Sequence, residues 1–361
     1  MTTFRTTQVG SWPRPKDLNA ENLDAKIKEV IRIQVSTGIE EITNGEYTRG
    51  IYFGGVTGLP GFSQAASRYE FSAGDLFPTP LLTGKIEYDF DRPFATSEVK
   101  AIKSALDALG AKRRIKYTIP SNSMVSFFYP NPDLPFLPPE AKAYYAKVQE
   151  GVKKEYPTYD SFIDHVTRIN VNEGRAAFAA GADSVQSDGP TVNVSGAGGR
   201  GFIRQLVQLD NIVLDALRGS GTLEFHACFG NGWNTQSDTS THYDGHLVEL
   251  VELHTDILGP LEVFDGWRDY KELGKIKSVS SVIPKGLDIS LGILSVKTRN
   301  VEPVGELAAR YEAAVDAVGK EIIASNGCGW ASGKDETIHG IEGARRKTAN
   351  LVAAVNSVRR E

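Results

Sequence analysis

His226, Cys228 and Cys328 are the residues of this 361-residue chain whose types are best suited to hold a metal ion. One residue separates His226 from Cys228, so in an extended segment both side chains point to the same side. The chain contains two cysteines, and both belong to this group. Zinc prefers thiolate and imidazole ligands and takes about four of them in a tetrahedron. These residue types therefore predict a zinc site, with Glu262, or another acid of the run 261–265, as the fourth ligand.

The elements that must position these residues are expected to alternate between strand and helix. Apolar residues recur at helical spacing in 19–37, 139–155, 159–180 and 341–359. Alternation of this kind implies a parallel sheet, and eight units predict an α/β fold closed as a (β/α)8 TIM barrel spanning 1–361. The eight predicted strands are 6–9, 39–43, 115–119, 183–188, 222–225, 261–264, 286–293 and 321–324.

Residues 52–94 interrupt this alternation after the second predicted strand. The segment is rich in Gly, Phe, Tyr and Pro, which are residues typical of hairpins and turns. We expect a hairpin-bearing insertion that serves as a lid over the site or as a contact in a homodimer.

Polar residues gather at the carboxyl ends of the predicted strands. In barrels of this type the chemistry lies on the loops that follow the strands, so these positions are the site candidates. Few of the residue types found there belong in an apolar core. The residues are Ser11, Glu46, Ser121, Asp188, His226, Cys228, Glu262, Ser295 and Cys328.

Charge and composition exclude several classes of partner. The chain has 40 Lys and Arg against 45 Asp and Glu, a formal net charge of −5, and no basic block, so we expect no nucleic-acid binding. No stretch approaches the roughly 20 apolar residues of a membrane span. The first residues lack the pattern of a signal peptide, and two cysteines cannot build a disulfide framework. We therefore expect a cytoplasmic protein.

Five segments resemble the C-terminal catalytic barrel of cobalamin-independent methionine synthases and the single-barrel members of that superfamily. Those members include epoxyalkane:coenzyme M transferases. The segments occur in the family's order and extend over nearly the whole chain: 9–15 (VGSWPRP), 44–49 (NGEYTR), 186–190 (QSDGP), 226–228 (HAC) and 326–329 (NGCG).

The resemblance implies a zinc-dependent transfer of a methyl or other alkyl group to a thiol, with homocysteine as the favoured acceptor. A free thiol is largely protonated at pH 7, and a zinc-bound thiol is held as the nucleophilic thiolate. Where the family places an Asp and a His that handle the proton, this chain has Ser295 and Lys297 as catalytic candidates. The implied zinc ligands are His226, Cys228, Glu262 and Cys328, and the residues implied to bind the amino acid part of homocysteine are Ser11, Glu46 and Asp188.

Departures from the family pattern concern the second substrate. The long methionine synthases have Asp-Glu-Pro where this chain has Asp-Gly-Pro at 188–190, and a Trp in the loop after strand three where this chain has 120–124. We therefore expect a donor other than the usual polyglutamyl methylfolate, such as a corrinoid, a corrinoid protein or another alkyl electrophile. Coenzyme M is the alternative acceptor, with Arg14 or Arg49 facing its sulfonate.

Two other enzyme classes remain as alternatives. A zinc hydrolase on a barrel would keep a water on the metal, but two thiolates reduce the acidity of the ion. A metal-free barrel related to uroporphyrinogen decarboxylase would leave His226 and both cysteines without a role. A second histidine group, at 242, 246 and 254, is predicted to lie on a solvated helix face.

Overall fold

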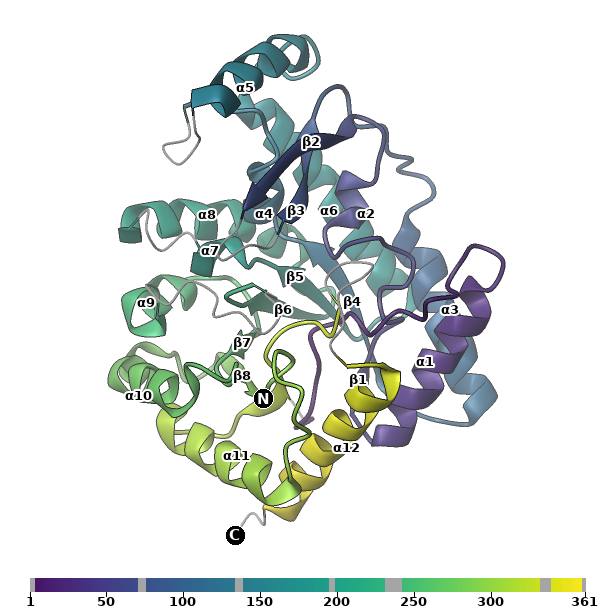
Figure 1. Ribbon diagram of the computed structural model, residues 1–361, viewed down its shortest axis with the longest axis vertical. Coiled ribbons are helices and arrows are strands. Elements are labelled where there is room, and N and C mark those ends of the chain that lie inside the picture. Colours follow the sequence, from purple (N-terminus) through teal and green to yellow (C-terminus); the bar gives the residue numbers. More distant parts are fainter. Residues whose placement is uncertain are drawn as a thin grey trace.

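A computed structural model describes residues 4–70, 76–133, 139–194, 199–230, 242–331 and 339–358. Seven strands form one curled parallel sheet in the order β1-β4-β5-β6-β7-β8-β9 (Figure 1). The strands are β1 (Glu41–Ile42), β4 (Arg114–Pro120), β5 (Ser184–Asp188), β6 (Thr222–Ala227), β7 (Ile257–Glu262), β8 (Asp288–Leu294) and β9 (Ile323–Asn326).

Helices surround this sheet on its outer side, which gives a TIM-barrel-like fold (Figure 1). The longer ones are α1 (Leu23–Thr37), α3 (Phe94–Leu109), α6 (Tyr159–Ala180), α8 (Gly199–Leu217), α10 (Asp269–Val279), α11 (Val304–Val318) and α12 (Ile341–Ser357). Their apolar faces pack on the strands in one large core cluster, as the helical spacing predicts. The shorter ones are α2 (Gly54–Thr57), α4 (Asn122–Ser126), α7 (Thr191–Val194) and α9 (Leu247–Leu250), and α5 (Pro139–Val152) is a further long helix. No helix among the described residues is long and apolar enough to cross a membrane.

The segment predicted as the first strand, 6–9, makes one isolated parallel bridge, from Thr6 to Ala324 of β9. On its other side the carboxylate of Glu40 accepts hydrogen bonds from the backbone amides of Arg5 and Thr6, at 2.8 and 2.9 Å. A side chain therefore takes the donors that a ladder with β1 would use. The segment lies between the two edge strands of the sheet without forming a full strand.

The sixth predicted strand, 261–264, begins too late. The observed strand, β7, starts at Ile257 and ends at Glu262. A proline within a strand removes a ladder hydrogen bond and is usually found at a strand edge or bulge. The strand accommodates Pro260 at a point where its register with β6 and β8 shifts, between Leu258 and Leu261.

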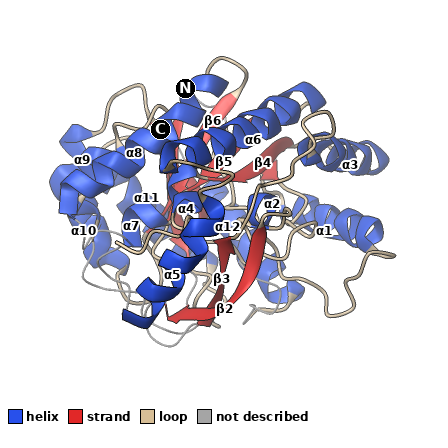
Figure 2. Ribbon diagram, turned by 90° about the horizontal axis from the view of Figure 1, so that it is seen from above, coloured by secondary structure: helices blue, strands red, loops and turns tan. Residues whose placement is uncertain are grey.

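Two further strands, β2 (Phe62–Glu70) and β3 (Leu76–Leu82), follow β1 and precede α3 along the chain. They pair with each other antiparallel. With α5 they lie to one side of the parallel strands, at the bottom of the view in Figure 2. The backbone amide of Leu82 donates to the carbonyl of Phe128, which joins this unit to the loop after β4. Residues 71–75 of the predicted insertion lie outside the described residues, and its role as a lid or a dimer contact stays a prediction.

A layer of charged and polar side chains crosses the interior of the sheet. Lys116 of β4 is fully buried, with its Nζ 2.7 Å from Glu224 Oε2 and 3.2 Å from Glu41 Oε2. The same ammonium donates to Thr7 Oγ1 and to Gln186 Oε1, each at 2.8 Å. This layer connects four strands and the N-terminal segment.

Candidate functional site

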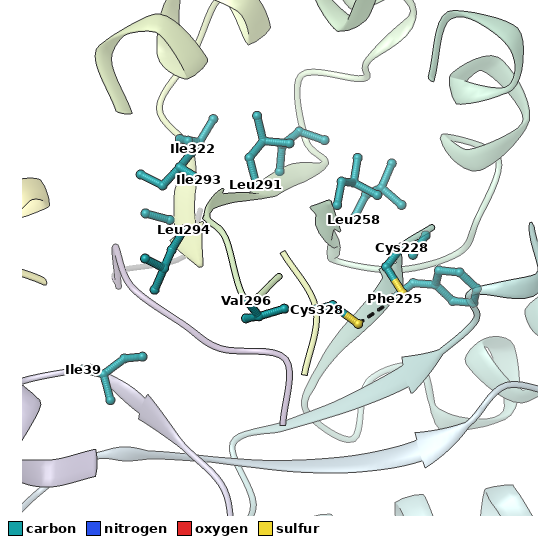
Figure 3. Close-up of a cluster of buried hydrophobic side chains, with 14 of the residues drawn as sticks. Ile39, Phe225, Cys228, Leu258, Leu291, Ile293, Leu294, Val296, Ile322 and Cys328 are labelled. Carbon is teal, nitrogen blue, oxygen red and sulfur yellow. Dashed lines mark hydrogen bonds between the residues drawn. The ribbon is translucent and has the colours of Figure 1, made fainter. Parts of the chain in front are cut away.

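An imidazole and two thiols meet at the carboxyl ends of β6 and β9. The ligand atoms of His226, Cys228 and Cys328 all lie within 4.8 Å of one another, and the three side chains are buried. The two Sγ atoms are 3.5 Å apart (Figure 3). We call these three residues the cysteine–histidine cluster. The structure thus brings together three of the four residues predicted as ligands.

Strand geometry directs the imidazole of His226 into this cluster. Its Nδ1 lies 2.6 Å from the carbonyl oxygen of Pro260. Because a carbonyl oxygen only accepts hydrogen bonds, Nδ1 carries the proton. In the neutral ring this leaves the lone pair on Nε2, which is the form that binds a metal ion.

Cys328 is placed by a turn that Asn326 holds. Asn326 Nδ2 donates to the carbonyl of Cys328 at 2.6 Å, and its Oδ1 accepts from the amide of Val9 at 3.2 Å. The hydrogen bond between the two thiols and burial hold the pKa of the Cys328 thiol well above its ordinary value. A pair of thiols with a neutral imidazole is a donor set that fits zinc, which favours the thiolate form of its sulfur ligands.

Glu262, the fourth predicted ligand, lies beside the cluster but is bound to other partners. Its Oε1 is 2.8 Å from Lys297 Nζ, and its Oε2 accepts from the backbone amide of Phe229 at 2.9 Å. Burial works against the charge of Lys297, but Glu262 and Asp265 raise its pKa. Glu262 and Lys297 therefore form an ion pair.

Ser295 and Lys297, the predicted catalytic pair, lie together in the loop after β8. Ser295 Oγ accepts from the amide of Lys297 at 3.2 Å, and the amide of Ser295 donates to Glu302 Oε1 at 3.2 Å. Both side chains are buried. Their predicted part in proton transfer stays a prediction.

Two carboxylates predicted to bind a substrate ammonium, Glu46 in the loop after β1 and Asp188 at the end of β5, are buried. Glu46 Oε1 accepts from Thr118 Oγ1 at 2.8 Å, and no donor among the described residues reaches its Oε2. Burial raises the pKa of Asp188 to about 7; His226 opposes this effect and the charge of Glu46 adds to it. A buried carboxylate oxygen that accepts no hydrogen bond, such as Glu46 Oε2, is suited to accept one from a cationic group of a ligand.

The backbone at Glu46 is in the left-handed region, with φ at 57°, which is unusual for a residue with a side chain. Hydrogen bonds hold it there: its amide donates to Asn44 Oδ1 at 2.9 Å, and its carbonyl accepts from Arg14 at 3.1 Å. Gly10 makes room for the carboxylate, because a Cβ at that position would lie 2.4 Å from Glu46 Oε1. The loop that carries Glu46 can therefore pack closely against the loop that carries Gly10.

Ser11, the third residue predicted at the amino acid subsite, contacts the loop that carries Cys328. Its Oγ accepts from the amide of Ala331 at 3.3 Å, and its carbonyl accepts from the amide of Trp330 at 3.1 Å. These bonds join the N-terminal segment to the loop after β9.

The two arginines considered for a sulfonate are engaged with the protein. Arg14 donates to the carbonyls of Ala331, Glu46 and Arg49 at 3.0 to 3.1 Å. Arg49 pairs with Glu98 at 3.4 Å and donates to Thr118 Oγ1 at 3.0 Å. The carboxylate that pairs with Arg49 is therefore that of Glu98 and not that of Glu46.

The prediction of a solvated helix face at 242, 246 and 254 is wrong, because none of the three histidines lies within a helix and His246 is buried. This side chain is 2% exposed, and its Nε2 lies 2.7 Å from Asn193 Oδ1. The helix there, α9, has four residues. A partner 53 positions away along the chain satisfies the imidazole, which no local pattern could indicate.

Tyr243 and Gln186 support the site and were missed in the sequence. Tyr243 Oη donates to the carbonyl of Ala227, the residue between His226 and Cys228, at 3.1 Å. Gln186 Nε2 donates to Asp188 Oδ1 at 2.7 Å. The alternation of β5 puts Gln186 and Asp188 on one face, a signal the sequence does contain. Nothing local points to Tyr243.

Among known proteins, the chain matches solved structures by its fold. No family profile and no curated protein sequence matches the chain. A B12-independent methionine synthase from a Shewanella species, in complex with selenomethionine, superposes with a TM-score of 0.67 at 17% identity, covering 98% of this chain and 97% of that one. A putative B12-independent methionine synthase from Listeria monocytogenes gives a TM-score of 0.65 at 19% identity, covering 99% and 98%.

A methyltransferase from Methanosarcina mazei gives a TM-score of 0.57 at 14% identity, covering 98% of this chain and 93% of that one. Coverage this complete means that the likeness involves the whole barrel and not one shared motif. The resemblance inferred from the five sequence segments is thus confirmed for the fold: this chain is similar over nearly its full length to B12-independent methionine synthases and a related methyltransferase.

Proposed function

We propose that the protein is a zinc-dependent thiol methyltransferase or alkyltransferase whose favoured acceptor is homocysteine. The observation that carries this proposal is the cysteine–histidine cluster at the carboxyl ends of β6 and β9. It occupies the end of a TIM-barrel-like fold where enzymes of this architecture perform their chemistry. Methionine is the product expected from homocysteine and a methyl donor.

His226, Cys228 and Cys328 would hold the zinc ion, which when bound favours the thiolate form of an acceptor thiol. Glu46 and Asp188 would bind the ammonium group of the acceptor, with Thr118 and Gln186 orienting the two carboxylates. Orientation in this way lowers the entropic cost of bringing sulfur and carbon together.

The hydrogen bonds that Arg14 and Arg49 already make within the protein favour an amino acid thiol over a sulfonate thiol as the acceptor substrate. Arg14 and Arg49 hold backbone carbonyls, Thr118 and Glu98. A sulfonate such as that of coenzyme M would have to compete for these donors, whereas Glu46 offers an acceptor to a cation. The donor we propose is a corrinoid, a corrinoid protein or another alkyl electrophile in place of polyglutamyl methylfolate.

Metal analysis coupled to a screen of thiol acceptors tests the proposal. We expect about one zinc ion per chain and methionine formed from homocysteine with a methyl donor, methylcobalamin or methylfolate, in separate assays. With an epoxide donor the product would instead be an S-hydroxyalkyl homocysteine, because the opened ring stays on the sulfur. Cys328→Ser should lower zinc content and abolish transfer together. Transfer that persists in zinc-free Cys328→Ser protein would refute the proposal, and hydrolysis of a test ester without any thiol would favour a zinc hydrolase.

A further inference from the structure

Glu98 of α3 is a buried carboxylate that accepts hydrogen bonds from side chains of the loop 44–49. Its Oε2 accepts from Asn44 Nδ2 at 2.7 Å, and its Oε1 accepts from Thr48 Oγ1 at 2.8 Å. The guanidinium of Arg49 lies 3.4 Å from Oε2. Glu98 is 7% exposed, so little water competes for these bonds.

Two paths of hydrogen bonds lead from Glu98 to Glu46. The first passes through Asn44, whose Oδ1 accepts from the backbone amide of Glu46 at 2.9 Å. The second passes through Arg49, which donates to Thr118 Oγ1 at 3.0 Å. The hydroxyl of Thr118 donates in turn to Glu46 Oε1 at 2.8 Å. Glu98 is therefore connected both to the left-handed backbone of Glu46 and to its carboxylate.

A carboxylate at position 98 sets the direction of the hydrogen bonds along both paths. Because an ionised carboxylate only accepts, the amide of Asn44 turns its Nδ2 toward Glu98 and its Oδ1 toward Glu46. A guanidinium only donates, so the proton of Thr118 Oγ1 points to Glu46 Oε1. Glu46 Oε2, which no donor among the described residues reaches, is then left to accept from a ligand.

We propose that Glu98 is a positioning residue that makes the candidate site selective for a thiol that carries an ammonium group. Through Asn44 and Thr118 it presents Glu46 as an acceptor, which an ammonium group satisfies and an uncharged alkyl chain does not. This inference rests on the proposed thiol methyltransferase function and deepens it, because it assigns the choice between acceptors to a residue of α3.

Binding of methionine and of desamino-methionine to the zinc-loaded protein tests the inference without catalysis. The two molecules differ in the ammonium group alone. Glu98→Gln puts an amide donor against the donors of the loop, so it should weaken methionine binding about tenfold and leave desamino-methionine binding within about twofold. Isothermal titration calorimetry measures both. Asp107→Asn changes the other acid of α3, which is exposed, and should affect neither ligand.

Thr118→Val interrupts the second path with no change in buried charge. It should also weaken methionine binding about tenfold. Thr118→Ser, which keeps the hydroxyl, should bind methionine within about threefold of the unmodified protein. A change that only loosened the barrel would weaken both ligands and would not distinguish valine from serine.

The double variant Glu98→Gln, Arg49→Met removes the ion pair as a unit and decides the matter if Glu98→Gln alone does not fold. It should show the same selective loss of methionine binding. Equal weakening of both ligands, or unchanged methionine binding, would overturn the inference and leave the proposed function standing. An unmodified protein that holds no zinc and binds methionine no more tightly than desamino-methionine would refute the proposed function, and the inference with it.

Discussion

Glu46 combines a left-handed backbone, a buried carboxylate and an acceptor oxygen that no described donor reaches. Such a combination costs stability and is typical of a residue that meets a ligand. Asp188 is the second carboxylate there, and Gln186 orients it. At the scale of single residues, the clearest expectation concerns recognition of the substrate ammonium.

Glu46→Gln should raise the KM for homocysteine about 10- to 100-fold, because a charge-assisted hydrogen bond becomes a neutral one. The kcat/KM for a simple alkanethiol, which lacks the ammonium group, should change little. Steady-state kinetics with both thiols measure this, and Glu21→Gln at an exposed position is the control. An equal loss for both thiols would mean that Glu46 acts on the metal centre and not on the ammonium.

Asp210 of α8 gives a pH-dependent expectation away from the site. Its Oδ1 accepts from the amide of Ser123 at 2.8 Å, and burial raises its pKa to about 7. Between the ordinary pKa of an aspartate and this value, the unfolded chain releases the proton while the folded protein keeps it. The free energy of unfolding contributed by Asp210 is therefore present at low pH and lost as pH rises toward 7.

Urea unfolding of the unmodified protein and of Asp210→Asn at pH 5 and pH 8 measures this contribution. Relative to the variant, the unmodified protein should lose roughly 2–3 kcal/mol over this range. The same difference at both pH values would show that Asp210 does not bind a proton in the folded protein.

At the scale of elements, the contact between β8 and the turn after β9 sets the position of Cys328. Gly292 of β8 pairs in register with Ser325, and a Cβ at position 292 would lie 2.2 Å from the Cα of Gly327. Backbone atoms cannot move aside as the end of a flexible side chain can. Close approach of these two strands therefore requires glycine at 292.

Gly292→Ala should lower the free energy of unfolding by roughly 1–3 kcal/mol and weaken zinc binding, since the turn that carries Cys328 must shift. Gly286→Ala is the matched control, because it lies in an exposed turn where a Cβ meets nothing within 4 Å. Denaturant unfolding and a zinc chelator competition measure the two effects. Equal stability of the two variants would contradict the expected clash.

At the scale of the whole molecule, Lys116 connects the strands across the interior of the sheet. Two buried carboxylates, Glu41 and Glu224, share its ammonium with Thr7 and Gln186. Gln186 in turn donates to Asp188, so hydrogen bonds connect the interior layer to the candidate site. Loss of the central cation should affect both stability and the site.

Lys116→Met should reduce the free energy of unfolding by roughly 3–5 kcal/mol, because it leaves buried carboxylates without their cation. Adding Glu224→Gln should restore part of the loss, which a double-mutant cycle measures. Lys112→Met, at an exposed position, should change stability by no more than about 0.5 kcal/mol. A loss below about 1 kcal/mol for Lys116→Met would refute this role.

The sequence by itself predicted the residue types of the cysteine–histidine cluster and the order of most of the elements. Helical spacing predicted the span 159–180, which is the span of α6. Strand alternation placed polar residues at strand ends, where His226 and Cys328 are found. Both signals are local, because side-chain periodicity within one element depends on backbone geometry alone.

Only the tertiary structure decided which side chains meet. The 3.5 Å contact between Cys228 and Cys328, the pairing of Glu262 with Lys297, and the burial of His246 each join residues from different strands or loops. These contacts depend on strand register and on the path of loops across the end of the sheet. Such relations arise when the chain folds, because residues far apart in sequence become neighbours only through the packing of the elements between them.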